Sequence, residues 1–89
     1  MRFLLKFYIS EIVWSRQHRK YAPSRIVEAI DMPIDREGLD EVATNPHFAM
    51  LQMLEQYEEK IGSVFRPCMV ILEIQERGQR LLLDKYVFR

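Results

Sequence analysis

The sequence predicts an α+β fold, a single domain over residues 1–89 in which strands and helices follow one another in the order β-α-α-β-β. Three observations lead to this class: an alternating apolar segment near the N-terminus, a well-marked amphipathic helix in the middle, and a hairpin at the C-terminus. Apolar residues make up 48% of the 89 residues and charged residues 29%, as in ordered globular domains. We expect a mainly antiparallel sheet with the helices packed on one face.

The N-terminal segment, residues 3–14, allows two interpretations. Its apolar residues alternate with period two, as in a strand, and Leu5, Ile9 and Ile12 would also share one stripe of a helix. Aromatic and β-branched side chains favour the strand. The next segment, residues 15–23, has no apolar periodicity and is predicted to be an exposed loop. The alternating residues of the strand interpretation are Phe3, Leu5, Phe7 and Ile9.

The central part of the chain predicts two helices. Ser24 can cap a short helix that ends at Ile30, before Pro33. An acidic connection follows, and residues 39–43 could add one helical turn. The main helix covers Pro46–Ile61, since Asn45 is a good N-cap and Gly62 suits the exit. Its expected apolar stripe consists of Phe48, Leu51, Leu54, Tyr57 and Ile61, widened by Met50 and Met53.

The C-terminal hairpin connects apolar strands at residues 68–74 and 81–88 through a polar turn around Gly78. A two- or four-residue loop sets Ile74 opposite Leu81 and Val70 opposite Lys85. One face then carries Cys68, Val70, Leu72, Ile74, Leu81, Leu83 and Val87. A second apolar set on so small a protein indicates a homo-oligomer, in the simplest case a dimer. The predicted oligomer interface is Met69, Ile71, Leu82, Tyr86 and Phe88.

Charge is balanced overall but unevenly distributed. Six bases oppose one acid in residues 1–27, two oppose nine in residues 28–60, and five oppose three in residues 61–89. The net charge of zero gives no general attraction to nucleic acid or to an anionic membrane. One cysteine and no long apolar run predict a soluble cytoplasmic protein without a membrane segment.

The residues that could support catalysis are few. There is no glycine-rich phosphate loop, no metal-ligand spacing and no paired general acid and base, so no catalytic residue, cofactor or metal is predicted. Cys68 could be a nucleophile with His18 or His47 as base, but a lone cysteine in an apolar strand is usually a core residue. We therefore expect a protein that is not an enzyme. A cleft joining Cys68 to either histidine would instead favour catalysis.

One basic segment is a candidate binding site. It could be a solvated loop, could contact the phosphates of nucleic acid, or could dock on an acidic surface of another protein. The predicted partner-binding residues are Arg16, His18, Arg19, Lys20, Tyr21 and Arg25, with Trp14 nearby. The first hypothesis is a small non-enzymatic, homo-oligomeric interaction or regulatory protein that binds a protein partner. The alternative is a nucleic-acid-binding protein, which a positive surface concentrated on one side of the assembled oligomer would favour.

Overall fold

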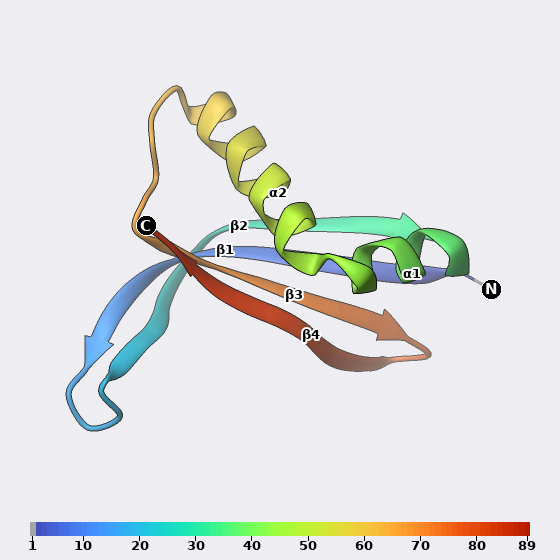
Figure 1. Cartoon of the computed structure of the whole chain (residues 1–89), viewed down its shortest axis with the longest axis horizontal. Coiled ribbons are helices and arrows are strands. Elements are labelled where there is room, and N and C mark those ends of the chain that lie inside the picture. The colour runs from blue at the N-terminus through green and yellow to red at the C-terminus, as the bar shows by residue number, and fades with distance from the viewer. Residues whose placement is uncertain (1) are drawn as a thin grey trace.

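A computed structural model describes residues 2–89. It contains one sheet of four antiparallel strands and two helices. The strand order across the sheet is β2-β1-β3-β4. The predicted α+β class, the antiparallel sheet and the C-terminal hairpin are confirmed. Along the chain the elements are β1 (Phe3–Ser15), β2 (Lys20–Ile34), α1 (Arg36–Thr44), α2 (Pro46–Ile61), β3 (Cys68–Glu76) and β4 (Gln79–Phe88) (Figure 1).

The N-terminal segment is a strand, as its aromatic and β-branched content predicted. β1 lies in the middle of the sheet and pairs with β2 on one side and β3 on the other. Because side chains alternate along a strand, its apolar period of two places every second residue on the face that packs under α2. We call this the core face and the opposite one the outer face. The residues that β1 buries on the core face are Phe3, Leu5, Phe7 and Ile9.

The helix expected at Ser24–Ile30 does not form, and most of the expected loop is absent. Both segments belong to β2, which starts at Lys20 and leaves only residues 16–19 as a turn. Capping by Ser24 would satisfy only a few backbone groups, whereas pairing with β1 provides backbone hydrogen bonds along a much longer segment, so the strand forms instead of the helix. β2 is an edge strand, and an edge strand tolerates Pro23 and Pro33, since their missing N–H groups need not face a neighbour.

The two helices follow directly after β2. Asp35 caps α1, and its side chain accepts a hydrogen bond from the Gly38 backbone N–H at 2.8 Å. α1 therefore begins before the single turn expected at residues 39–43. α2 has the predicted bounds, since Asn45 accepts from the Phe48 N–H at 3.3 Å and Gly62 ends the helix with a φ of 74°. A left-handed residue there is usually glycine, because other side chains are strained in that conformation.

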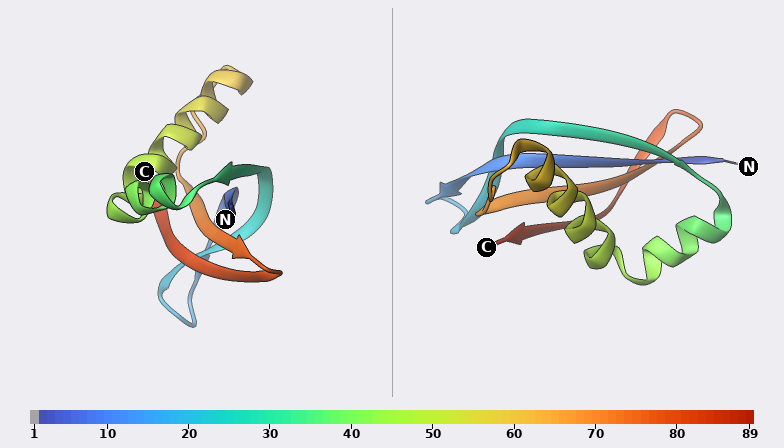
Figure 2. Two further views of the ribbon diagram at one scale, coloured as in Figure 1. Left: turned by 90° about the vertical axis from the view of Figure 1, so that its right-hand side faces the viewer. Right: turned by 90° about the horizontal axis from the view of Figure 1, so that it is seen from above.

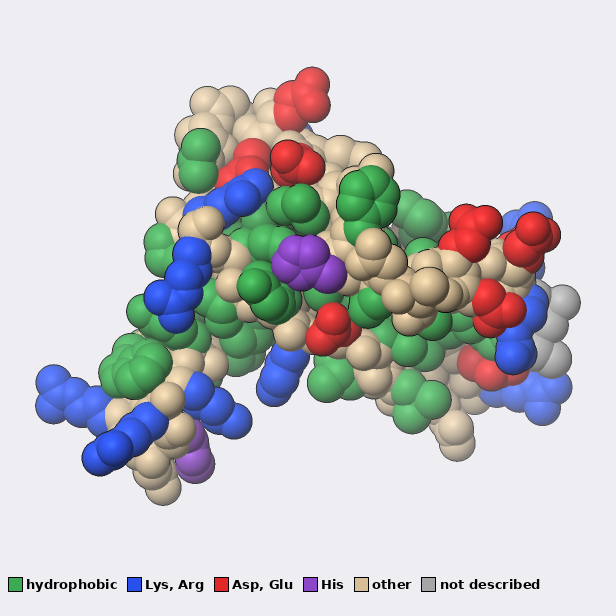
Figure 3. All heavy atoms as spheres, viewed as in Figure 1, with side chains coloured by type: hydrophobic (Ala, Val, Ile, Leu, Met, Phe, Trp, Pro, Cys, Tyr) green, Lys and Arg blue, Asp and Glu red, His purple; other side chains and the backbone are tan. Residues whose placement is uncertain are grey.

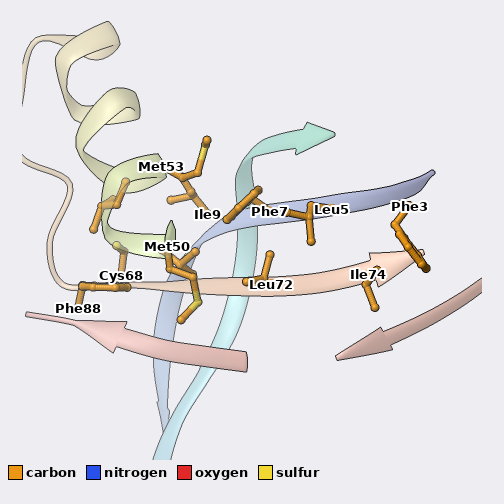
Figure 4. Packing of buried hydrophobic residues seen from close by; sticks show 12 residues of the cluster. Phe3, Leu5, Phe7, Ile9, Met50, Met53, Cys68, Leu72, Ile74 and Phe88 are labelled. Carbon is orange, nitrogen blue, oxygen red and sulfur yellow. The ribbon is translucent and has the colours of Figure 1, made fainter. Parts of the chain in front are cut away.

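The core lies between α2 and the core face of the sheet (Figure 4). α2 contributes Met50, Met53 and Leu54, whereas Phe48 and Ile61 of the expected stripe are exposed. The methionines of the helix thus fill the core, as predicted. α1 adds only partly buried side chains at its margin. The strands contribute Phe3, Leu5, Phe7, Ile9, Cys68, Val70, Leu72, Ile74 and Phe88.

The register of the C-terminal hairpin is correct near the turn and wrong beyond it. Ile74 faces Leu81 as predicted. Farther from the turn the register shifts between Glu73 and Leu72, so Val70 faces Tyr86 and Cys68 faces Phe88. Leu83 is the extra residue of a β-bulge, and one inserted residue moves every later side chain to the other face. Tyr86 and Phe88 consequently lie on the core face, with Phe88 buried. They are therefore not part of the predicted second apolar face.

Candidate nucleic-acid interface

The far halves of β1 and β2 form a hairpin arm, residues 11–25, that leaves the body of the sheet. Figures 1 and 2 show the arm bending away from the side that α2 covers. Two register shifts between the strands lie at the base of the arm, one between Ile9 and Ser10 and one between Ser10 and Ile12. Extra residues on one strand of a pair bend it and increase its twist. The irregular pairing at Ser10 therefore sets the direction of the arm.

Polar contacts hold the base of the arm. Ser10 is fully buried, and its Oγ lies 2.7 Å from the carbonyl oxygen of Glu11 and 3.2 Å from that of Arg25. The side chains of Glu11 and Arg25 form an ion pair across the two strands. A buried hydroxyl that bonds backbone carbonyls satisfies groups that the bulge leaves without a ladder partner. The arm is thus a defined extension of the sheet.

Two aromatic rings contact each other edge to face across the outer part of the arm. Trp14 pairs with Tyr21 in the ladder, and their ring centroids lie 5.0 Å apart at 75°. Such edge-to-face geometry is favourable for aromatic pairs. The guanidinium carbon of Arg89, beyond the end of β4, lies 5.4 Å from the centroid of the Tyr21 ring, within the range of a cation–π contact. Arg89 therefore contacts the outer part of the arm.

A hollow of about 440 Å³ opens between the arm and the ends of β3 and β4. Three of the residues that line it are aromatic, and four are cationic. None of them is Asp or Glu. The aromatic residues are Trp14, Tyr21 and Tyr86, the cationic ones are Arg19, Lys20, Lys85 and Arg89, and Met69 and Val87 complete the lining. We call this site the basic hollow.

Two smaller depressions adjoin the basic hollow and share Arg89 with it. One, of about 250 Å³, also contains Tyr21, Arg66 and Pro67. The other, of about 350 Å³, contains Arg66, Arg89 and the rings of His47 and Phe88 on the core-face side of β4. Arg66 is already paired with the Glu58 carboxylate at 3.0 Å, so its charge is largely satisfied within the chain. The concave surface therefore continues past Arg89, but its unpaired cations are concentrated in the basic hollow.

Positive and negative side chains separate in space. In the space-filling view the arm carries Lys and Arg and no acidic side chain is visible on it, whereas acidic side chains gather over the helices (Figure 3). The exposed acids of the helices include Glu37, Asp40, Glu41, Glu55 and Glu59. The neutral net charge of the chain thus conceals a molecule with a basic end, and local potential decides which ligands a cleft attracts.

The predicted partner-binding residues divide into two groups. Arg19, Lys20 and Tyr21 line the basic hollow. Arg16 and His18 are exposed in the turn and line neither this hollow nor the adjoining depressions, and Arg25 is engaged by Glu11. Sequence reasoning missed Lys85, Val87 and Arg89, and it assigned Met69 and Tyr86 to an oligomer interface. Nothing local marks these residues, because only the pairing of β1 with β3 and of β3 with β4 brings them to the arm.

Cys68 does not have the properties of a catalytic nucleophile. It is fully buried, and burial raises the pKa of its thiol to about 11, with a further increase from the nearby Glu58 carboxylate that Arg66 partly offsets. A thiol with this pKa is protonated at neutral pH, whereas the thiolate is the reactive form. The prediction that Cys68 is a buried core residue is confirmed.

Within residues 2–89, no group of three or more His, Cys, Asp or Glu side chains is placed to hold a metal ion. Neither helix in this part of the chain is long and apolar enough to cross a bilayer.

Comparison of the chain with models of known protein families, with curated proteins and with solved structures found no match. The chemistry of the basic hollow is therefore the basis for the proposed function.

Proposed function

We propose that this chain is a non-enzymatic binding protein that holds single-stranded nucleic acid in the basic hollow. The observation that supports this most is the composition of the lining, which combines four cations with the paired rings of Trp14 and Tyr21 and no carboxylate. Single-strand binders combine the same two parts, a positive groove that follows the phosphates and rings on which bases stack.

Exposure of the cations supports this assignment. Arg19, Lys20, Lys85 and Arg89 are all exposed, and none of them forms an ion pair with a described residue. A phosphate that binds them releases counterions without first breaking a salt bridge. Trp14 is also half exposed, so part of its ring is free to stack on a base.

The aromatic rings favour nucleic acid over an acidic segment of a protein partner, the occupant of the first hypothesis. Asp and Glu side chains would satisfy the four cations but have no ring to place against Trp14 and Tyr21. A nucleotide offers both a phosphate and a planar base. The protein-partner hypothesis stays a prediction, and a peptide competitor separates the two.

The test is a binding titration of a labelled single-stranded oligonucleotide at several salt concentrations, followed by fluorescence anisotropy. Four phosphate contacts predict a log–log slope of affinity against salt of roughly −3, since each contact contributes about −0.7 for single strands. The Arg19→Ala/Lys20→Ala variant should reduce the magnitude of that slope to roughly half.

The matched control removes two cations from the opposite end of the molecule. Arg2→Ala/Arg36→Ala produces the same change in net charge but leaves the basic hollow intact. It should keep the wild-type slope. Absence of binding at low salt, an equal loss in both double variants, or complete displacement by polyglutamate at matched charge concentration would contradict the proposal.

A further inference from the structure

A second surface, on the outer face of the sheet, has features that point to another ligand. Here a hollow of about 470 Å³ is lined by Tyr8, Ile26, Ile71, Glu73 and Arg80. Leu82 faces Glu73 across the strand pair and is 55% exposed. We call these six residues the outer patch. It is separate from the basic hollow, since no residue lines both.

The outer patch contains a carboxylate without a partner. Oε1 of Glu73 is shielded from solvent and accepts no hydrogen bond within the described part of the chain. The cross-strand neighbour of Glu73 is Lys6, but the Lys6 ammonium donates to Asp31 at 2.9 Å instead. Native proteins leave few shielded polar atoms unpaired, because a polar atom removed from water without a hydrogen-bond partner destabilises the fold. A donor from outside the chain would satisfy this oxygen.

A matching donor lies in the same patch. The Arg80 guanidinium has one long contact, 3.4 Å from Nη1 to the hydroxyl oxygen of Tyr8, and forms no ion pair with a described residue. The patch therefore presents one underused cation and one underused anion around the same hollow, together with Tyr8, Ile26, Ile71 and Leu82. Such a surface is complementary to itself. When two copies meet across a two-fold axis, the cation of each copy lies opposite the anion of the other.

We propose that the outer patch binds a second copy of this chain, with Glu73 of each protomer paired to Arg80 of its partner. The apolar side chains around the two charges would be buried together, and the two ion pairs would fix the register of the contact. This interface keeps Ile71 and Leu82 of the sequence-predicted set and replaces Met69, Tyr86 and Phe88 by Tyr8 and Ile26. It does not depend on nucleic-acid binding.

A mixing experiment tests the pair directly. Glu73→Arg places two bases in the patch and Arg80→Glu places two acids there, so each variant alone should be monomeric or dimerise at least about tenfold more weakly than wild type. An equimolar mixture should restore the dimer, because the two bases of one protomer then meet the two acids of the other. Sedimentation velocity at micromolar concentration measures all three samples.

The control mixture combines Glu59→Arg with Arg36→Glu, two exposed helix positions outside the patch, and should dimerise like wild type both separately and together. If either patch variant fails to fold by circular dichroism, Leu82→Lys replaces it, since an exposed position tolerates the change, and this variant should be monomeric. A monomeric wild type, full dimerisation of the single variants, or a mixture that stays monomeric would overturn the proposal.

Discussion

β1 and β2 each have two halves that behave differently, one in the body of the sheet and one in the hairpin arm. In the body, Leu5 and Ile9 of β1 are fully buried in the core, whereas Val13 and Trp14 of the same strand are 53% and 51% exposed in the arm. The change occurs at the irregular pairing around Ser10. The comparison teaches that the body supplies the stability of this protein, and the arm leaves its side chains free to bind.

The largest expected effect is the loss of a core side chain from the body. Leu54 of α2 is fully buried, so Leu54→Ala should lower the free energy of unfolding by about 2–5 kcal/mol. The corresponding truncation in the arm, Val13→Ala, should cost about 0.5 kcal/mol or less because Val13 is half exposed. Urea denaturation measures both. Equal costs would show that the arm is as much part of the core as α2.

A smaller effect is expected from the ion pair that joins α2 to the connection before β3. Glu58 accepts from the Phe65 N–H at 2.8 Å and from two nitrogens of Arg66 at 3.0 and 3.2 Å. Burial raises the pKa of the Glu58 carboxyl, but these hydrogen bonds and the Arg66 charge more than offset it, so the pKa lies below its ordinary value of 4.5. Glu58→Gln should cost about 1–3 kcal/mol at pH 7.

The sign of this pKa change predicts a pH dependence. A carboxyl with a lowered pKa in the folded state stabilises the protein above 4.5, and this stabilisation is lost as the pH falls through the folded-state pKa. The difference between wild type and Glu58→Gln should therefore shrink in acid. The arm provides the control, since Glu11 and Arg25 are 42% and 75% exposed and Glu11→Gln should cost at most about 1 kcal/mol. A Glu58→Gln difference that is the same at pH 7 and pH 3 would contradict the assignment.

The smallest effect on stability is expected from the cations of the basic hollow. Arg19 and Lys20 are exposed and unpaired, so each alanine substitution should change the free energy of unfolding by no more than about 0.5 kcal/mol. A change of that size shifts the thermal midpoint by roughly 2–4 °C for a domain of this size. The double variant Arg19→Ala/Lys20→Ala should therefore shift the midpoint by no more than about 4–8 °C, and a larger drop would mean that its binding defect reflects loss of structure.

The parts of the fold that local chemistry determines were predictable from the sequence. Asn45, Pro46 and Gly62 set the bounds of α2 through their own backbone preferences, and the alternation in β1 identified its buried side. The helix predicted at Ser24–Ile30 was wrong because its capping signal is local, whereas β2 depends on pairing with β1, a partner that a local pattern does not contain.

The bulge and the site show the same limit at longer range. A turn fixes the register of the residues next to it, such as Ile74 and Leu81, but not that of Tyr86 and Phe88 beyond an inserted residue. The sequence likewise indicated Arg19, Lys20 and Tyr21 as one basic segment. Lys85 and Arg89 join them only after the sheet has formed, so no pattern within a short window could identify the complete basic hollow.

The most direct test of a separate binding arm uses the single tryptophan of the chain. Trp14 is the only tryptophan and lies in the arm, so its fluorescence reports on the basic hollow and not on the core. Addition of single-stranded oligothymidylate at low salt should quench this fluorescence, and salt should reverse the quenching. Lys85→Ala/Arg89→Ala, which changes only the β4 side of the hollow, should weaken the quenching while the unfolding midpoint stays near that of wild type. Unchanged fluorescence, or quenching that does not depend on Lys85 and Arg89, would contradict the account.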